Sequence, residues 1–224
     1  MTREEIQERI LESIGDDPAS PVFFSTSQLN SLINEALEVL VEDIRAVKRQ
    51  ALVPLKQGVG FIHTPTIDPD FMAPLRIWNH ANSQRLTCLS MAELDAFHIR
   101  WQETTQTPEV WFPVSWDIFG IYPKPAAAEG VLRIDYLAWP RSLLDDEDHP
   151  EIPEATHDAL VLYGQYMGCL KKWDSQSANI PLQALRIHKE VAKARSGISR
   201  ISVRSMSRPA IPGEKFPSTY PTGE

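Results

Sequence analysis

Hydrophobic residues recur at helical spacing at the start of the chain. Thr2 and Glu5 have the spacing of a capping box, and Gly15 stands where a left-handed C-terminal cap belongs. Between them, four aliphatic residues share one helical face, namely Ile6, Ile10, Leu11 and Ile14. The pattern predicts a short first helix.

A longer hydrophobic stripe follows. Ser25 and Gln28 form a second capping box, and Phe24 and Leu29 are placed as its hydrophobic staple. Apolar residues then continue at steps of three and four, at Leu29, Leu32, Ile33, Ala36, Leu37, Leu40, Val41, Ile44 and Val47. This stripe predicts a long amphipathic helix.

The pattern changes between residues 53 and 140. Prolines arrive every few residues, and β-branched and aromatic residues gather into short runs. We expect a helix in this block only over residues 90–101, where Ser90 and Glu93 have capping-box spacing. The runs predict strands near residues 59–63, 75–80, 84–88, 109–115, 117–122 and 131–138.

Helical spacing resumes after Pro153 and extends to about Lys172. A second helix is predicted over about residues 179–195, where Pro181 is tolerable because it lies near the start. The sequence therefore predicts an α+β fold, a helical bundle interrupted by a small antiparallel β block. The expected parts are N-terminal helices (1–52), an inserted β-rich domain (53–141), C-terminal helices (142–196) and an extended, basic, proline-rich segment (197–224).

Composition supports a folded domain. The chain has 224 residues, of which 42% are hydrophobic and 23% charged, and these values exclude a disordered chain and a coiled-coil rod. Cys88 and Cys169 are far apart and lack a second thiol at metal-binding spacing. The N-terminus has no signal-peptide core, and no apolar run approaches the length of a membrane helix. We expect a protein that is intracellular when made and has no membrane partner.

Charge is unevenly distributed around a net value of −8. Residues 1–50 carry 5 basic and 10 acidic side chains, whereas residues 186–224 carry 8 basic and 3 acidic ones. A globally acidic surface disfavours tight wrapping of nucleic acid, which depends on cationic side chains. The basic C-terminal segment is the exception.

Signatures of common enzymes are missing from the sequence. Gly58 and Gly60 give a G-x-G, but position 63 is His and no phosphate-binding loop follows. The nucleophile-elbow, H-E-x-x-H and paired C-x-x-C motifs are also absent. We therefore expect neither a cofactor nor a metal.

One dense group of possible metal ligands leaves an alternative open. His149 and His157 lie near Asp145, Asp146, Glu147, Asp148, Glu151 and Asp158. Oxygen and imidazole ligands of this kind could hold a divalent cation in a metal-dependent enzyme. The favoured interpretation is a solvated acidic loop followed by a helix whose first turn attracts carboxylates.

Two features are candidates for subunit contacts. Gly164 and Gly168 lie four residues apart on one helix face, which lets another helix approach closely. The run VWFPVSWDIFGIYPKP places apolar side chains on both faces of a two-stranded unit. Packing within one chain remains the alternative for both features. The interface candidates of the aromatic run are Trp111, Phe112, Trp116, Phe119 and Tyr122.

Arginines are spread through the C-terminal segment. Those singled out as interface candidates are Arg195, Arg200, Arg204 and Arg208. Arginine pairs with carboxylates and phosphates alike, so the segment suits an acidic protein neighbour, a portal subunit or nucleic acid. A solvated terminus without a partner is the plain alternative.

The order of motifs resembles the head-to-tail adaptor proteins of tailed bacteriophages, a family that includes tail tubular and gatekeeper proteins. The resemblance covers about residues 25–195, through the segments VGFIHTPTIDPDFMAPLRIWN, RLTCLSMAELDAFHIRWQ, TPEVWFPVSWDIFGIYPKP and VLRIDYLAWPRSLLDDEDHPEIPEATHDALVLYGQYMGCLKKWDSQSA. The chain departs from the family pattern at Gln106-Thr107, where Gly is common, and in its long basic C-terminal segment. The matching positions are Pro69, Asp70, Trp101, Pro108, Trp111, Tyr122, Pro123, Pro125, Tyr136, Pro140, Leu143, Ile152, Pro153 and His157.

The resemblance implies a non-enzymatic structural protein of the virion neck. The expected partners are other copies of the chain in a ring of about twelve, the portal protein, the tail or next neck protein, and DNA that passes through the bore. An acidic wall reduces attraction to DNA that must slide. We therefore expect a channel-facing position for Asp145, Asp146, Glu147, Asp148 and Glu151.

Overall fold

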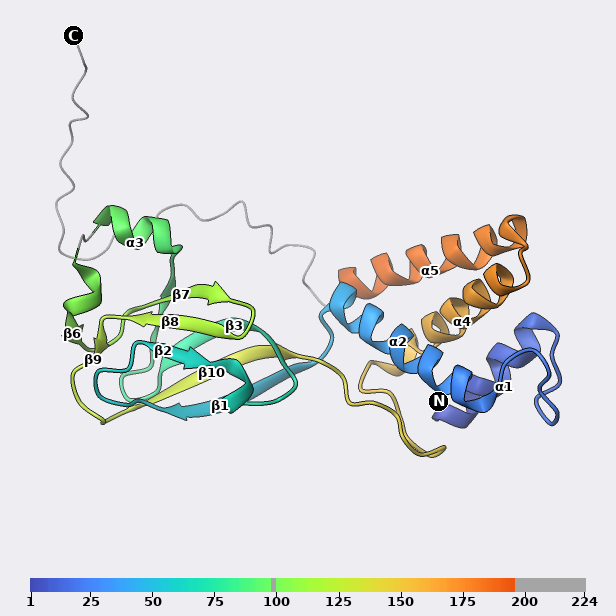
Figure 1. Cartoon of the computed structure of the whole chain (residues 1–224), viewed down its shortest axis with the longest axis horizontal. Coiled ribbons are helices and arrows are strands. Elements are labelled where there is room, and N and C mark those ends of the chain that lie inside the picture. The colour runs from blue at the N-terminus through green and yellow to red at the C-terminus, as the bar shows by residue number, and fades with distance from the viewer. Residues whose placement is uncertain (98–99, 196–224) are drawn as a thin grey trace, which may run out of the picture.

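The computed structural model describes residues 1–97 and 100–195. Figure 1 shows two lobes, one helical and one built mainly of strands. The helical lobe contains α1 (Arg3–Ile14), α2 (Thr26–Ile44), α4 (Asp158–Lys171) and α5 (Ser175–Arg195). The strands lie between α2 and α4 in the sequence, so the α+β class is confirmed.

The first two helices begin as their sequences predict. Thr2 accepts a hydrogen bond from the Glu5 amide while Glu5 caps Thr2 in return, and Ser25 and Gln28 do the same for α2. Each helix buries its aliphatic stripe in the bundle. The α1 helix ends at Gly15, whose φ of 74° provides the left-handed cap.

The β lobe consists of three small sheets. The first has the order β1-β10-β3-β4, the second β2-β8-β7-β5, and the third pairs β6 with β9. The strands are β1 (Lys48–Pro54), β2 (Phe61–His63), β3 (Phe71–Asn79), β4 (Gln84–Arg85), β5 (Thr87–Cys88), β6 (Thr105–Gln106), β7 (Val110–Ser115), β8 (Ile118–Tyr122), β9 (Lys124–Pro125) and β10 (Val131–Ala138). The lobe also carries α3 (Met91–Phe97) and two 3₁₀ turns, η1 (Thr64–Thr66) and η2 (Trp101–Glu103), and a third, η3 (Glu154–Thr156), precedes α4.

Pairing between β1 and β10 brings the entrance and the exit of the β lobe together. The two strands are antiparallel, with Lys48 opposite Leu137 and Pro54 opposite Val131. Because β1 follows α2 and β10 leads toward α4, this pairing returns the chain to the bundle it left (Figure 1).

In the four-helix bundle, α2 and α4 contact each other and lie between α1 and α5. Both α1 and α5 pack against α2 and α4, whereas α1 and α5 do not pack on each other to a comparable extent. Gly164 and Gly168 face inward on α4: a Cβ atom on Gly164 would lie 2.5 Å from Ile10 Cδ1, and one on Gly168 would lie 2.6 Å from Ile14 Cγ2. The glycines thus serve close packing of α1 on α4, the intrachain alternative left open by the sequence.

Several element limits differ from those predicted. Strand β1 was not predicted, since the first strand was expected near residues 59–63, and its alternating residues are only half buried and give a weak hydrophobic signal. The β lobe therefore begins at Lys48 rather than at residue 53. Helix α5 starts at Ser175, so Pro181 is an interior residue rather than an early one. Helix α3 ends at Phe97, short of residue 101, and the segment 197–224 lies outside the described residues.

The α1–α4 contact predicts the effect of adding one methyl group. Replacing Gly164 by Ala should lower the free energy of unfolding by about 1–3 kcal/mol, although Ala is the better helix former, because the fully buried Ile10 has no room to move. Denaturant titration measures the change. Ile10→Val should recover part of it by shortening the opposing side chain. A Gly164→Ala protein more stable than wild type would contradict this packing, and Gln165→Ala on the same helix is the control.

Candidate assembly surfaces

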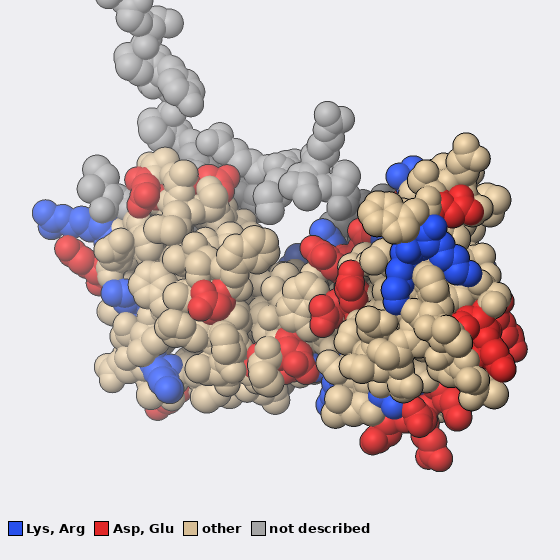
Figure 2. All heavy atoms as spheres, turned by 45° about the vertical axis from the view of Figure 1, so that its right-hand side comes forward, with Lys and Arg blue, Asp and Glu red and all other residues tan. Residues whose placement is uncertain are grey.

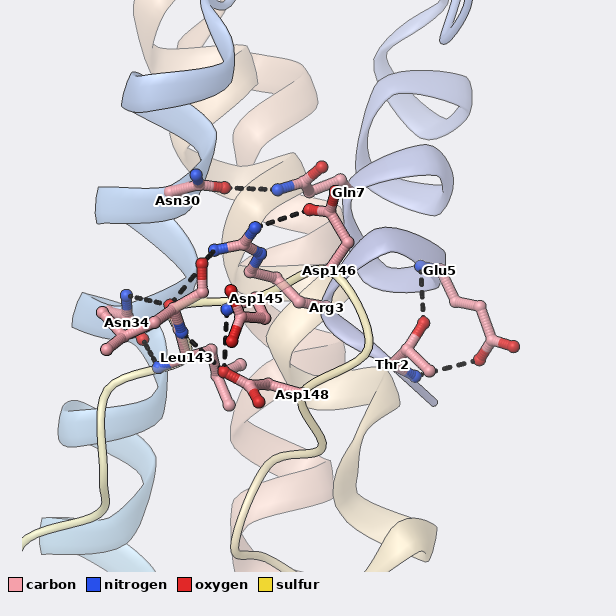
Figure 3. A network of polar contacts seen from close by, with 11 residues as sticks. Thr2, Arg3, Glu5, Gln7, Asn30, Asn34, Leu143, Asp145, Asp146 and Asp148 are labelled. Carbon is pink, nitrogen blue, oxygen red and sulfur yellow. Dashed lines mark hydrogen bonds and ion pairs between the residues drawn. The ribbon is translucent and has the colours of Figure 1, made fainter.

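The acidic loop before α4 is tied to the start of α1. The Arg3 side chain is buried and donates hydrogen bonds to the carbonyls of Leu143 and Leu144 and to the Asp146 carboxylate (Figure 3). The Arg3 and Glu4 amides bond in turn to the Asp148 and Asp146 carbonyls at 2.9 and 3.2 Å. This loop is therefore part of the scaffold.

The same loop is held to α2 and folded on itself. Asn34 accepts a hydrogen bond from the Leu143 amide at 2.8 Å and donates to the Leu143 carbonyl at 3.3 Å. The Asp148 carboxylate accepts from the Leu144 and Asp145 amides, and these bonds lower the pKa of Asp148. Asp145 and Glu147 remain exposed, with no side-chain partner among the described residues.

A second polar cluster joins the loop to the β lobe. Arg49 on β1 contacts Asp70 at 3.1 Å, Asp68 at 3.3 Å and Glu151 at 2.9 Å. Burial opposes ionisation of Asp68, but hydrogen bonds from Tyr136, the Asp70 amide and Arg49 outweigh it and lower its pKa. Burial and the bond to Asp68 raise the pKa of Tyr136 to about 12. The Glu151 carboxylate is therefore part of the ion-pair network around Arg49.

His157 is not placed to bind a metal ion. Its Nδ1 lies 3.0 Å from the Met1 ammonium and its Nε2 lies 3.1 Å from the Ile152 carbonyl. The ammonium can only donate, so Nδ1 accepts and Nε2 carries the proton. Within residues 1–97 and 100–195, no group of three or more His, Cys, Asp or Glu side chains could hold a metal ion. His149 contacts the Met1 carbonyl, so both histidines of the metal-dependent alternative contact main-chain groups rather than the neighbouring carboxylates.

Most of the aromatic run lies inside the β lobe. Trp111, Phe112 and Phe119 are 8%, 0% and 2% exposed, and Tyr122 is half buried against Trp101. Trp111, Phe112 and Phe119 therefore pack within one chain, which was the alternative to a subunit contact, whereas Tyr122 keeps part of its surface exposed. Trp116 differs: it occupies the β7–β8 turn and is 96% exposed. Of the basic candidates, Arg195 ends α5 and is exposed, while Arg200, Arg204 and Arg208 lie outside the described residues.

A second exposed tryptophan was not predicted from the sequence. Trp173 follows α4 and is 95% exposed, and Val22 on the α1–α2 connection is 89% exposed. Lys171 and Lys172 contact the Phe23 ring and also donate to the Phe23 and Ile14 carbonyls, which holds the two connections at the same end of the bundle (Figure 1). The sequence signal that could have identified Trp173 is a Trp directly after a predicted helix, at a position where Gly is usual.

Trp173 has an unfavourable backbone conformation. Its amide bonds to the Leu170 carbonyl and the Asp174 amide bonds to the Cys169 carbonyl, both at 3.0 Å, which is a Schellman motif. Its φ of 59° is in the left-handed region, which costs a non-glycine residue about 1–2 kcal/mol. At the same end of the bundle, α1 uses Gly15 for the equivalent position.

A cavity of about 340 Å³ lies where the two lobes meet. It is bordered by the ends of α2 and α5, the start of β1 and η3. Its apolar lining includes Ala155, Val191 and Ala192, and its cations are Arg45, Lys48 and Arg195. We call this the waist cavity.

Charges are not spread evenly over the surface. Figure 2 shows many acidic side chains on the helical lobe and fewer on the β lobe. The outward face of α1 contributes exposed Glu4, Glu8 and Glu12. Like charges at this spacing repel, so this face stays solvated or meets a cationic partner.

Comparison with known proteins points to one family. The family model described as SU10 adaptor protein matches residues 1–212. No curated protein matches the chain. Among the described helices, none combines the length and apolar character needed to span a membrane.

The surroundings of His157 predict a dependence of stability on pH. Burial and the Met1 ammonium lower its pKa below 6.5, against the opposing effect of the Ile152 carbonyl and Glu154. Between the folded pKa and 6.5 the unfolded chain binds more protons, so the free energy of unfolding should fall as pH drops below 6.5. Urea titrations at about pH 7.5 and about pH 5.5 measure this difference, which should shrink in His157→Gln. An identical pH response in that variant would contradict the assignment.

The conformation of Trp173 predicts that its removal stabilises the chain. Trp173→Gly should raise the free energy of unfolding by about 0.5–1 kcal/mol, because relief of the left-handed strain exceeds the added freedom of the unfolded chain. Gly15→Ala should have the opposite effect, and Trp116→Ala should change little. Thermal or urea unfolding of the three variants tests the ranking, and a destabilised Trp173→Gly would show that the indole supports the fold.

Proposed function

Because the chain belongs to the SU10 adaptor protein family, we propose that it is a structural protein of a tailed-phage virion that joins the head to the tail. The match over residues 1–212, which confirms the resemblance to head-to-tail adaptors, carries this proposal. The described polar clusters are consistent with it, because Arg3, Arg49 and His157 serve to connect elements of the fold. The protein acts without catalysis.

Copies of the chain assemble into a ring in the neck, beneath the portal, and surround the DNA channel. A ring requires a heterologous contact, in which two different surfaces of each copy meet and the rotation closes. The portal protein lies on one side of the ring and the tail or the next neck protein on the other. DNA passes through the bore without sequence-specific binding. We keep twelve as the expected copy number.

The acidic loop supplies the channel-facing charge. Asp146 and Glu151 are paired with arginines, which partly neutralises their charges, and the Asp148 carboxylate is turned toward the amides of its own loop. Asp145 and Glu147 are exposed and are therefore the side chains best suited to repel passing phosphates. A neck map with both residues on the outer wall would contradict this assignment.

Contacts with the portal or a neighbouring protein involve exposed residues on both lobes. Trp116 offers a large aromatic side chain at the tip of a hairpin, the type that dominates interface energetics. Arg195 and the segment after it, with Arg200, Arg204 and Arg208, bind acidic surfaces of the portal or of another copy.

Loss of the protein predicts a specific assembly defect. A phage with a nonsense codon in this gene should produce heads and tails that remain separate, because no ring joins them. Electron microscopy of the lysate counts joined particles, and addition of the purified full-length chain should restore joining. Joined particles that lack the chain would contradict the proposal, and addition of heat-denatured protein is the control.

A further inference from the structure

Within residues 1–97 and 100–195, the Trp173 side chain has almost no packing contact. It is 95% exposed, and it occupies the Schellman position where glycine is preferred. Strained residues of this kind often mark functional positions. Large exposed aromatic residues are typical anchors of protein interfaces, where they enter a pocket on the partner.

The waist cavity has the chemistry to receive such an anchor. Its volume of about 340 Å³ is near the lower limit of the range for small-ligand pockets, so it suits one large side chain. Ala155, Val191 and Ala192 supply apolar contacts. Arg45, Lys48 and Arg195 have no ion-pair partner among the residues described, and a cation is attracted to the face of an indole ring.

The charges near Trp173 and the charges that border the waist cavity are opposite in sign. Asp174 follows Trp173 directly, and Asp16 and Asp17 lie on the neighbouring α1–α2 connection. Lys171 and Lys172 point to carbonyls and to the Phe23 ring of that connection. The Asp16, Asp17 and Asp174 carboxylates accept hydrogen bonds from amides of their own turns, and their negative charge near Trp173 is opposite in sign to that of the cations around the waist cavity.

Trp173 cannot reach the cavity of its own chain. It precedes Ser175 at the first end of α5, whereas Val191, Ala192 and Arg195 border the cavity at the other end (Figure 1). A helix of 21 residues spans roughly 30 Å. A contact between the two features must therefore join different copies.

We propose that Trp173 of one copy inserts into the waist cavity of the next copy. This contact is heterologous, because each copy offers Trp173 at one surface and the cavity at another, and it repeats from copy to copy. The inference rests on the proposed function, since it identifies the self-contact that the ring needs. In each copy, Trp173 precedes the first residue of α5, and the cationic waist cavity lies beside the last residues of the same helix.

Cross-linking of two distinguishable copies tests the contact. A tagged full-length chain with Ser175→Cys is mixed with an untagged full-length chain with Ala155→Cys, both also carrying Cys88→Ser and Cys169→Ser. A short bis-maleimide should link them into a mixed dimer, and a chain with both new cysteines should form a ladder of oligomers. Adding Trp173→Gly to the tagged chain should reduce the yield roughly tenfold or more, and Trp116→Ala, an equally exposed tryptophan, is the matched control.

Several results would overturn the inference. These are the absence of a mixed dimer, a dimer that survives Trp173→Gly, a dimer lost in Trp116→Ala, or, in a chain that also carries Ser202→Cys, an intrachain link to Ala155→Cys that replaces the mixed dimer. The last result would place the chain's own C-terminal segment in the cavity. If heads and tails join normally while the mixed dimer is absent, only this contact is refuted. If the dimer forms but the phage joins heads to tails without the protein, the proposed function fails and the self-contact stands.

Discussion

Close packing of α1 on α4 is the interaction on which the rest of the structure depends. Gly164 and Gly168 allow Ile10 and Ile14 to approach the α4 backbone, and this contact joins the first helix to one that begins only at Asp158. Once α1 is in place, Arg3 can reach Leu143, Leu144 and Asp146, which orders the acidic loop. The antiparallel pairing of β1 with β10 makes this closure possible, because it returns the chain to the bundle after the β lobe.

Regular periodicity determined which parts of the fold could be predicted. The capping boxes at Thr2 and Ser25 and the stripe along α2 fixed those helices, because local hydrogen bonds and one buried face suffice to define them. The first strand was missed since its burial alternates between half buried and exposed. The partners of Gly164 and the burial of Phe112 depend on residues distant in the sequence, so spacing alone left intrachain and intersubunit packing open. Trp173 carried a local signal, a bulky residue at a helix end, that hydrophobic patterning does not detect.

The distribution of polar contacts separates scaffold from surface. Arg3, Arg49 and His157 are engaged between elements, and their partners come from segments far apart in the chain. Such groups maintain a rigid unit, whereas the side chains of Trp116, Trp173, Asp145 and Glu147 are exposed and connect no elements of the described part of the chain. A protein that acts by shape needs this division, because a rigid unit can repeat one contact accurately around an axis.

A cryo-electron microscopy reconstruction of the neck of the intact virion tests the central claim most directly. The account requires density for several copies of this chain arranged as a closed ring around the DNA, between the portal and the tail, with both lobes as described. A neck that lacks the chain, or a single copy bound beside the channel, would contradict it.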